Sequence, residues 1–203
     1  MQKAILLLNG TPYGGQIDCQ NAYVMCCDGA YAWAKDKVRI DENIGDFDSL
    51  PYAPFPSPSE IYPSEKDYTD GEIALRKLIS KGFKQIEIYG GSGGREDHFL
   101  GNLQLLYYAH KKDVSAKMVN DNSELFIGGG KITLNGIKGK TFSVLPFGCE
   151  LHINDSEGFK YAYPEKLCYG ECRGISNVGQ SDLGFLSIGE EETALIIINK
   201  GKV

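Results

Sequence analysis

The stretch QIEIYGGSGGREDHFLGNLQLLYYAH, residues 85–110, contains an apolar run, a glycine-rich loop and an amphipathic segment in succession. Residues 85–89 are typical of a buried strand, and residues 90–94 form a loop with four glycines. One face of a helix is predicted from the spacing of Phe99, Leu100, Leu103, Leu106 and Tyr107. A further strand is predicted at residues 116–119. Strands that alternate with helices in this way favour a mainly parallel sheet.

The same alternation extends over the first 120 residues. Strands are predicted at residues 4–8 and 22–27, and one or two helical turns at residues 31–35. Thr69 and Glu72 have the spacing of a capping box, in which each side chain bonds the backbone N–H of the other residue. A helix is therefore predicted from there to near Gly82. The fold class predicted for this half is α/β, with helices on both faces of the sheet.

Prolines are frequent in residues 51–63, for which we predict no regular structure. After about residue 121 the pattern changes to short strand-like runs separated by Gly, Asn and Pro. An all-β sandwich is predicted there. The predicted domains are residues 1–124 and 125–203. The strand-like runs of the second domain are residues 125–127, 131–134, 141–145, 150–153, 183–188 and 193–198.

Composition excludes several classes of protein. Of 203 residues, 42% are hydrophobic and 24% are charged, which suffices for a packed core and excludes wholesale disorder. The net charge of −6 disfavours a nucleic acid as partner. No apolar stretch reaches the length of a membrane span, so no membrane partner is expected and the expected location is the cytoplasm. The six cysteines are expected to be reduced thiols.

Acidic residues gather where the predicted strands end. They occur in residues 45–49, 66–70 and 94–98, and Asp28 follows an apolar run directly. Parallel sheets bind ligands beyond the carboxyl ends of their strands, so these acids are expected to lie at the ligand edge. Acids at helix starts and turns also have an ordinary structural explanation. Together, however, they would repel one another, and Mg²⁺ suits such hard oxygen ligands.

The loop at residues 90–94 is followed by a helix, and such a loop exposes N–H groups that bind phosphate oxygens. Lys66 and Arg95 add positive charge that suits phosphate. Metal, phosphate cradle and basic side chains together indicate phosphoryl-type transfer. The G-x-x-x-x-G-K-[ST] motif does not occur, which excludes a P-loop kinase. A metal-dependent nucleotide phosphohydrolase and a non-catalytic nucleotide-sensing module remain alternatives.

With these segments, the chain resembles the thiamin pyrophosphokinase (thiamin diphosphokinase) family over nearly its whole length. The matching motifs are GDFDS at 45–49, KDYTD at 66–70, GGSGGREDH at 90–98, Asp28-Gly29, SVLPFG at 143–148 and GISN at 174–177. The resemblance implies an ATP-dependent diphosphotransferase, which converts ATP and thiamin to thiamin diphosphate and AMP. It also implies an N-terminal domain that binds ATP and Mg²⁺ and a C-terminal domain that helps to bind thiamin. The implied assembly is a homodimer, with the active site at the subunit interface.

The resemblance also implies roles for individual residues. Catalytic roles fall to Asp46, Asp48, Asp67, Asp70, Arg95 and Asp97, of which Asp46, Asp48 and Asp70 hold the Mg²⁺. Binding roles fall to Asn9, Asp28, Lys66, Thr69, Gly91, Gly93, Gly94, His98, Ser176 and Asn177. Asp97 orients the substrate or helps to take the hydroxyl proton. This chain departs from animal and fungal members at Val178, where they carry a Trp.

Overall fold

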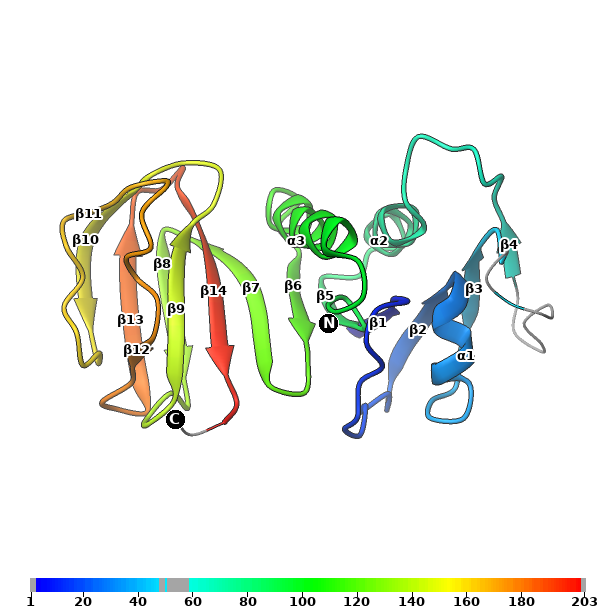
Figure 1. The fold of residues 1–203 in the computed structure, drawn as a ribbon, viewed down its shortest axis with the longest axis horizontal. Helices are drawn as coiled ribbons and strands as arrows, with labels where there is room; N and C mark the ends of the chain where they lie inside the picture. The colour runs from blue at the N-terminus through cyan, green and yellow to red at the C-terminus, as the bar shows by residue number, and fades with distance from the viewer. Residues whose placement is uncertain (1–2, 48–49, 51–58, 202–203) are drawn as a thin grey trace. The chain divides into compact units, whose positions relative to one another are not determined.

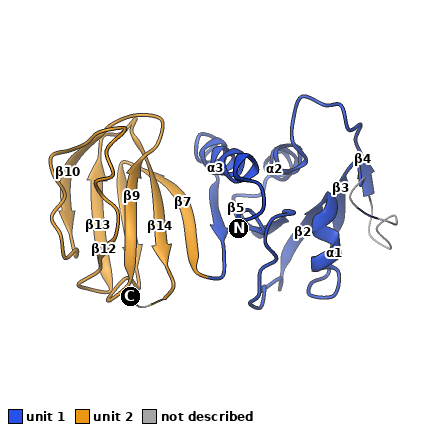
Figure 2. Cartoon of the chain, viewed as in Figure 1, with its two compact units in different colours: residues 1–121 blue, residues 122–203 orange. Residues whose placement is uncertain are grey.

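The computed structural model describes residues 3–47, 50 and 59–201. The chain divides into two compact units, residues 1–121 and 122–203 (Figure 2). The boundary predicted from the sequence lies between residues 124 and 125, and the binding roles given to the two halves stay predictions. All six cysteines are free thiols.

Unit 1 is built on six parallel strands in the order β6-β5-β1-β2-β3-β4. Their bounds are β1 Lys3–Leu7, β2 Ala22–Cys27, β3 Glu42–Gly45, β4 Ser59–Ile61, β5 Gln85–Tyr89 and β6 Ser115–Val119. The chain builds outward from β1 to β4 on one side, then returns to place β5 on the other side of β1 (Figure 1). The strand order thus reverses between β1 and β5, and such reversals create crevices for ligands.

Helices cover both faces of this sheet. They are the 3₁₀ turn η1 Asp28–Ala30 and the helices α1 Tyr31–Ala34, α2 Asp70–Ser80 and α3 Glu96–His110. Alternate residues of β1 and β2, such as Leu7 and Cys26, share a core with Ala34 of α1. The next residue of β2, Cys27, points to the opposite face, where its Sγ lies 3.6 Å from the carbonyl oxygen of Asp70. The predicted fold class of this half is confirmed.

The apolar face predicted for α3 is partly wrong. Leu100 is 60% exposed, and the buried residues are Leu103, Leu105, Leu106 and Ala109. Leu100 belongs neither to the buried core nor to the residues that line the cavity described below, so its side chain is left to solvent. The contact with the sheet begins one turn later than the spacing of apolar residues suggests.

The prediction of no regular structure in residues 51–63 is also wrong at one point. Ser59–Ile61 forms β4, which pairs in parallel with β3. The strand is three residues long and lies at the sheet edge, so it bonds a neighbour on one side alone. The prolines at positions 58 and 63 lie outside it, so none interrupts its hydrogen bonds.

Unit 2 is a sandwich of two antiparallel sheets, as predicted. One sheet has the order β12-β9-β14-β7 and the other β11-β10-β13-β8. Residues of both sheets, such as Phe142 of β9 and Leu186 of β13, form one buried core. The strands β11 and β12, of two residues each, were not predicted. The bounds are β7 Ser123–Gly129, β8 Lys131–Asn135, β9 Thr141–Pro146, β10 Leu151–Glu157, β11 Lys166–Leu167, β12 Asn177–Val178, β13 Leu183–Ile188 and β14 Thr193–Asn199.

Among the described residues, no helix has the length and apolar character that crossing a membrane requires.

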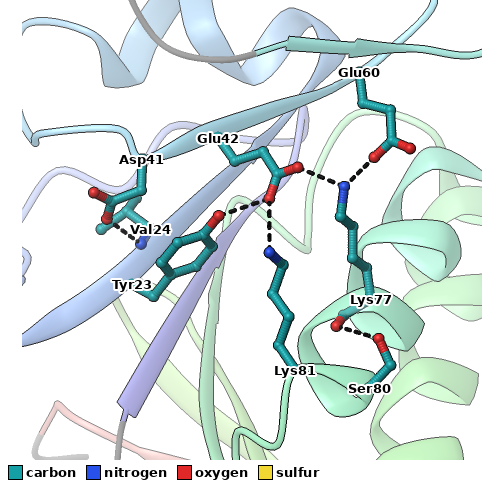
Figure 3. Close-up of polar contacts among 8 residues, drawn as sticks. All are labelled: Tyr23, Val24, Asp41, Glu42, Glu60, Lys77, Ser80 and Lys81. Atoms are coloured by element: carbon teal, nitrogen blue, oxygen red, sulfur yellow. Dashed lines mark hydrogen bonds and ion pairs between the residues drawn. The ribbon is translucent and has the colours of Figure 1, made fainter.

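A charged network ties α2 to three strands of unit 1 (Figure 3). Glu42 of β3 is buried, and its carboxylate accepts hydrogen bonds from Tyr23 of β2 (2.6 Å) and from Lys77 of α2. Lys77 also pairs with Glu60 of β4, and Lys81 lies 3.7 Å from Glu42. Burial alone would raise the pKa of Glu42, but the bonds from Lys77 and Tyr23 lower it below its ordinary value of 4.5. The ionised network therefore stabilises the fold.

We predict that Lys77→Met lowers the free energy of unfolding by about 2 kcal/mol, because it leaves the charge of buried Glu42 poorly compensated. Urea unfolding at pH 7 measures the change. The matched control is Lys81→Met, one turn further along, which removes a longer and more exposed contact and should cost less than about 0.5 kcal/mol.

The pH dependence gives a second measure of the same network. Because the pKa of Glu42 is lowered, its contribution is complete above pH 4.5 and is lost as the pH falls through the lowered value. The stability difference between the wild type and Glu42→Gln should therefore shrink below pH 4.5. Equal stabilities of Lys77→Met and the wild type at pH 7 would contradict the role given to the network.

Candidate active site

A cavity of about 1150 Å³ opens in unit 1 at the carboxyl ends of the strands. Its walls are the segments after β1, β2, β3 and β5, the segment before α2, and the first turns of α2 and α3. The predicted site residues that line it are Asn9, Asp28, Asp46, Lys66, Asp67, Thr69, Asp70, Gly91, Gly93, Gly94, Arg95, Asp97 and His98. Asp48 lies outside the described residues. Segments more than 80 residues apart in the sequence thus meet in one cavity, although the individual roles stay predictions.

Lys66 joins two of the cavity's carboxylates. Its Nζ lies 2.9 Å from Oδ1 of Asp70 and 3.7 Å from Oδ2 of Asp46, and all three side chains are mostly covered. Burial raises the pKa of Asp70, Lys66 opposes this, and the charges of Asp46 and Asp28 add to it, so that the pKa is raised on balance. Ionisation of Asp70 therefore lowers the stability of the folded protein.

Strained backbone positions the acids. Asp28 and Phe47 adopt positive φ values of 42° and 58°, which residues other than glycine rarely do. Gly45, at φ 150°, precedes Asp46, and a Cβ on it would press against Asp28. The backbone of β3 thus approaches Asp28 closely because Gly45 has no side chain. Strain of this kind is characteristic of functional sites, since the surrounding structure must enforce it.

Half of the predicted capping box is present. The hydroxyl oxygen of Thr69 accepts a hydrogen bond of 3.2 Å from the N–H of Glu72, so Thr69 begins α2 as expected. The carboxylate of Glu72 does not complete the box, because it accepts two hydrogen bonds from the guanidinium of Arg76, one turn later. A fixed start to α2 fixes the position of Asp70, its first residue.

The glycine-rich loop is braced by the loop that follows β1. The N–H of Gly10 donates to the carbonyl of Gly90, and the N–H of Thr11 donates to that of Ser92. The side chain of Trp33 lies against Gly90. Two further contacts leave no room for a Cβ, namely Leu8 O against Gly90 and the Thr11 hydroxyl against Gly93, while the flexible Met118 side chain lies against Gly91. Gly90 and Gly93 are thus required by contacts within the protein.

Gly94 differs from the other glycines of this loop. Its φ is 76°, and a Cβ added to it would meet no atom of the protein within 4 Å. It also lines the cavity. Ligand binding is predicted for Gly91, Gly93 and Gly94. Among these three, Gly94 is the one whose missing side chain leaves open space for a ligand.

Arg95 and Asp97 form a two-pronged ion pair at the start of α3. Nη2 and Nε of Arg95 lie 2.6 and 3.1 Å from the two carboxylate oxygens of Asp97, which also accepts the N–H of His98. Arg95 holds the pKa of Asp97 below its ordinary value. Asp97 is therefore a weak proton acceptor in this arrangement, and its effect is to orient Arg95.

Sequence motifs missed several polar residues that also line the cavity. Tyr68, Glu72, Asn102, Gln104 and Tyr108 belong to its walls. All but Tyr68 lie on the inner faces of α2 and α3, where single side chains one turn apart make no recognisable motif. Arg76 stacks its guanidinium 4.9 Å from the ring centre of Tyr68 and 4.4 Å from that of Tyr108, which fixes this side of the cavity.

Ser176 and Asn177 belong to unit 2. The Asn177 side chain is buried, and it bonds the backbone N–H and carbonyl of Tyr161. Ser176 adopts a positive φ of 60°, and its N–H donates to the hydroxyl of Ser143. Asn177 thus connects two segments of unit 2, and a ligand contact of either residue stays a prediction.

The described residues include no group of three or more acidic, His or Cys side chains arranged to hold a metal ion. Lys66 lies between Asp46 and Asp70, the two described residues among the predicted magnesium ligands. The donor atoms nevertheless suit Mg²⁺, because they are carboxylate oxygens in a cavity where negative charge is already unfavourable. The magnesium site stays a prediction.

We predict that Asp70→Asn stabilises the ligand-free protein. Between pH 3.8 and the raised pKa of Asp70, the folded state binds more protons than the unfolded state, so stability falls as the pH rises. Above the raised pKa the penalty is complete, and its removal should raise the unfolding midpoint measured there by roughly 2–4 °C. Thermal unfolding followed by circular dichroism, without metal or nucleotide, measures this. The control is Asp67→Asn, an exposed acid of the same cavity, which should leave the midpoint unchanged. A lower midpoint for Asp70→Asn would refute the argument.

We predict that Gly94→Ala weakens nucleotide binding more than it destabilises the fold. A positive φ costs alanine about 1 kcal/mol. Gly82→Ala, with a φ of 88° and open space at the end of α2, is the matched control and should lose similar stability with unchanged binding. Calorimetric titration with ATP should show affinity at least about tenfold lower for Gly94→Ala, because a methyl group would obstruct the ligand's approach. Equal ATP affinities of the two variants would contradict this role for Gly94.

Comparisons with known proteins agree with the fold and the motifs. A family model described as thiamin pyrophosphokinase, catalytic domain, matches residues 16–118. Thiamine pyrophosphokinase of Bacillus subtilis (strain 168) is 35% identical over 103 residues, which make up 50% of this chain and 48% of that protein. The matched region thus spans about half the length of this curated relative.

Solved structures match over nearly the whole chain. The crystal structure of thiamine pyrophosphokinase from Bacillus subtilis has a TM-score of 0.83 and 26% identity, covering 99% of this chain and 100% of that one. That of thiamin pyrophosphokinase from Geobacillus thermodenitrificans has a TM-score of 0.81 and 25% identity, covering 99% and 98%. From the family-model match over half of its length, together with this fold and cavity, we conclude that the chain belongs to the thiamin pyrophosphokinase family.

Proposed function

We propose that the protein catalyses the magnesium-dependent transfer of a pyrophosphoryl group from ATP to the hydroxyl of thiamin. The products are thiamin diphosphate and AMP. The observation that carries this proposal is the gathering of Asp28, Asp46 and Asp70 with Lys66 beside the glycine-rich loop in one cavity. Relatives named thiamine pyrophosphokinase support the identity of the acceptor.

The reaction requires positioning and charge compensation above all. The thiamin hydroxyl oxygen forms a bond to the β-phosphorus of ATP, and the bond from that phosphorus to the oxygen bridging the α- and β-phosphates breaks. AMP leaves with that oxygen, and the hydroxyl proton passes to solvent or a nearby base. Phosphoryl transfer has a loose transition state and needs little help from a base. The weak basicity of Asp97 beside Arg95 is therefore compatible with catalysis.

Each part of the cavity has a task in this scheme. Backbone N–H groups at Gly94, where no side chain obstructs the approach, and in the first turn of α3 bind phosphate oxygens. Arg95, oriented by Asp97, is an exposed guanidinium that contacts the transferring group. Asp46 and Asp70, with Asp48, would hold Mg²⁺, which neutralises charge on the phosphate oxygens when bound.

We also propose that the protein acts as a homodimer, which the family resemblance implies. Unit 2 exposes the large side chains of Tyr161, Tyr169 and Ile175, each more than half accessible, and a partner subunit could cover them. Sedimentation equilibrium tests the assembly independently of activity. A monomer at all concentrations would remove this part of the proposal.

The proposed reaction is tested by product analysis. Purified protein with Mg²⁺, ATP and thiamin should release AMP and thiamin diphosphate. Release of ADP and thiamin monophosphate would reject a pyrophosphoryl transfer. Product formed without thiamin would favour a nucleotide phosphohydrolase, and ATP binding without turnover across a panel of vitamins would favour a nucleotide-sensing module.

We predict that Asp46→Asn lowers kcat by at least about 100-fold, because it removes one of the charges that hold the metal. The thermal unfolding midpoint should change little, which separates catalysis from folding. Asp36→Asn, an exposed acid outside the cavity, is the control and should keep wild-type turnover. Wild-type turnover in Asp46→Asn would remove the metal role from this residue.

A further inference from the structure

An ammonium group occupies the middle of the acidic cavity. Lys66 Nζ lies 2.9 Å from Asp70 and 3.7 Å from Asp46, and its side chain is 14% exposed, less than that of either acid. The two carboxylates come from different elements, since Asp46 follows β3 and Asp70 begins α2. The lysine thus joins the two walls from which the predicted metal ligands come.

Charge explains why a cation is needed at this point. Asp28, Asp46 and Asp70 all line the same cavity, so three like charges gather there. Arg95, the other cation with a predicted role here, is 72% exposed and pairs with Asp97. Among the described residues, Lys66 is the cation that forms ion pairs with both Asp46 and Asp70.

The chemistry of the lysine side chain permits it to exchange partners. An ammonium on four methylene groups is a compact charge that can swing between sites, whereas a guanidinium is planar and more rigid. Mg²⁺ and Mn²⁺ prefer carboxylate oxygens. A divalent cation that arrives alone must therefore displace a covered ammonium. A nucleotide brings phosphate oxygens, which offer the ammonium a new partner.

We propose that Lys66 holds the place of the divalent cation in the ligand-free protein and moves to the nucleotide phosphates when these arrive. This inference rests on the proposed function, since it concerns the same cavity. Its consequence is that metal and nucleotide bind together, because the nucleotide frees Asp46 and Asp70 for the metal. Lys66 is thus a positioning residue, with one partner before binding and another after it.

The experiment measures two affinities of Lys66→Met that should change in opposite directions. Mn²⁺ alone, titrated by calorimetry without nucleotide, should bind at least about tenfold more tightly than to the wild type, because no ammonium competes with it. ATP titrated in excess EDTA should bind at least about tenfold more weakly, because a phosphate partner is lost. A residue with a merely structural role would weaken both.

Three further variants make the result decisive. Lys66→Gln should behave like Lys66→Met and provides a second, polar replacement that should fold. Lys66→Arg keeps the positive charge and should leave Mn²⁺ binding as weak as in the wild type. Lys84→Met, an exposed lysine outside the cavity, should change neither affinity.

Unchanged or weaker Mn²⁺ binding by both neutral variants would overturn the inference. That outcome is independent of the reaction catalysed, since no turnover is measured. Thiamin-dependent release of AMP with unchanged Mn²⁺ binding would leave the proposed function in place and reject the role of Lys66. Tighter Mn²⁺ binding in a protein that releases no AMP would support the role of Lys66 and reject the pyrophosphokinase.

Discussion

The hydrogen bonding of β1 on both of its edges is the constraint on which unit 1 depends. Leu7 lies opposite Cys26 of β2 and opposite Tyr89 of β5, so three strands end at the same level. The residues that follow these strands therefore emerge at one edge of the sheet. Because the strand order reverses at β1, the loop after β1 lies against the loop after β5, as the bond from Gly10 to Gly90 shows. The cavity and its acids follow from this pairing.

Two largely covered acids of unit 1 show how the same kind of group serves structure in one place and is expected to serve function in another. Glu42 and Asp70 each meet a lysine, Lys77 and Lys66 respectively. The pKa of Glu42 is lowered on balance, whereas burial raises that of Asp70 and the nearby charges of Asp46 and Asp28 add to this effect. The ion pair of Glu42 therefore stabilises the fold, while Asp70 remains charged in a setting that a further cation would improve. Residual charge imbalance of this kind is typical of binding sites.

Much of this architecture could be predicted from the sequence because it depends on local patterns. The strands β2, β5 and β13 have the predicted bounds, and Thr69 begins α2 as its spacing indicates. The face of α3 could not be fully predicted, because a helix pattern does not reveal which of its apolar residues the rest of the fold covers, and Leu100 stays exposed. β4 was missed because its three residues are stabilised by pairing with β3 and by the contact from Glu60 to Lys77, which are distant in sequence.

The same limit applies to the candidate site. Motifs located the acids, since Asp46 and Asp70 occur in recognisable segments, but the position of Lys66 between them is a property of the folded chain alone. The partner of Asp97 could be guessed from its proximity to Arg95, whereas its consequence, a lowered pKa that disfavours a role as base, required the geometry. Tyr108 and Gln104 were missed because they reach the cavity from the side of a helix.

The glycine-rich loop shows that a motif can combine two different physical requirements. Gly90 and Gly93 lack side chains because the carbonyl of Leu8 and the hydroxyl of Thr11 occupy the space, and the flexible side chain of Met118 lies against Gly91. Such contacts hold the loop in place whether or not a ligand is present. Gly94 combines a positive φ with open surroundings. Close packing of the first three thus provides a rigid base, and the last can face a ligand. A sequence pattern with four glycines does not separate these roles, because the atoms that distinguish them come from the loop after β1 and from β6.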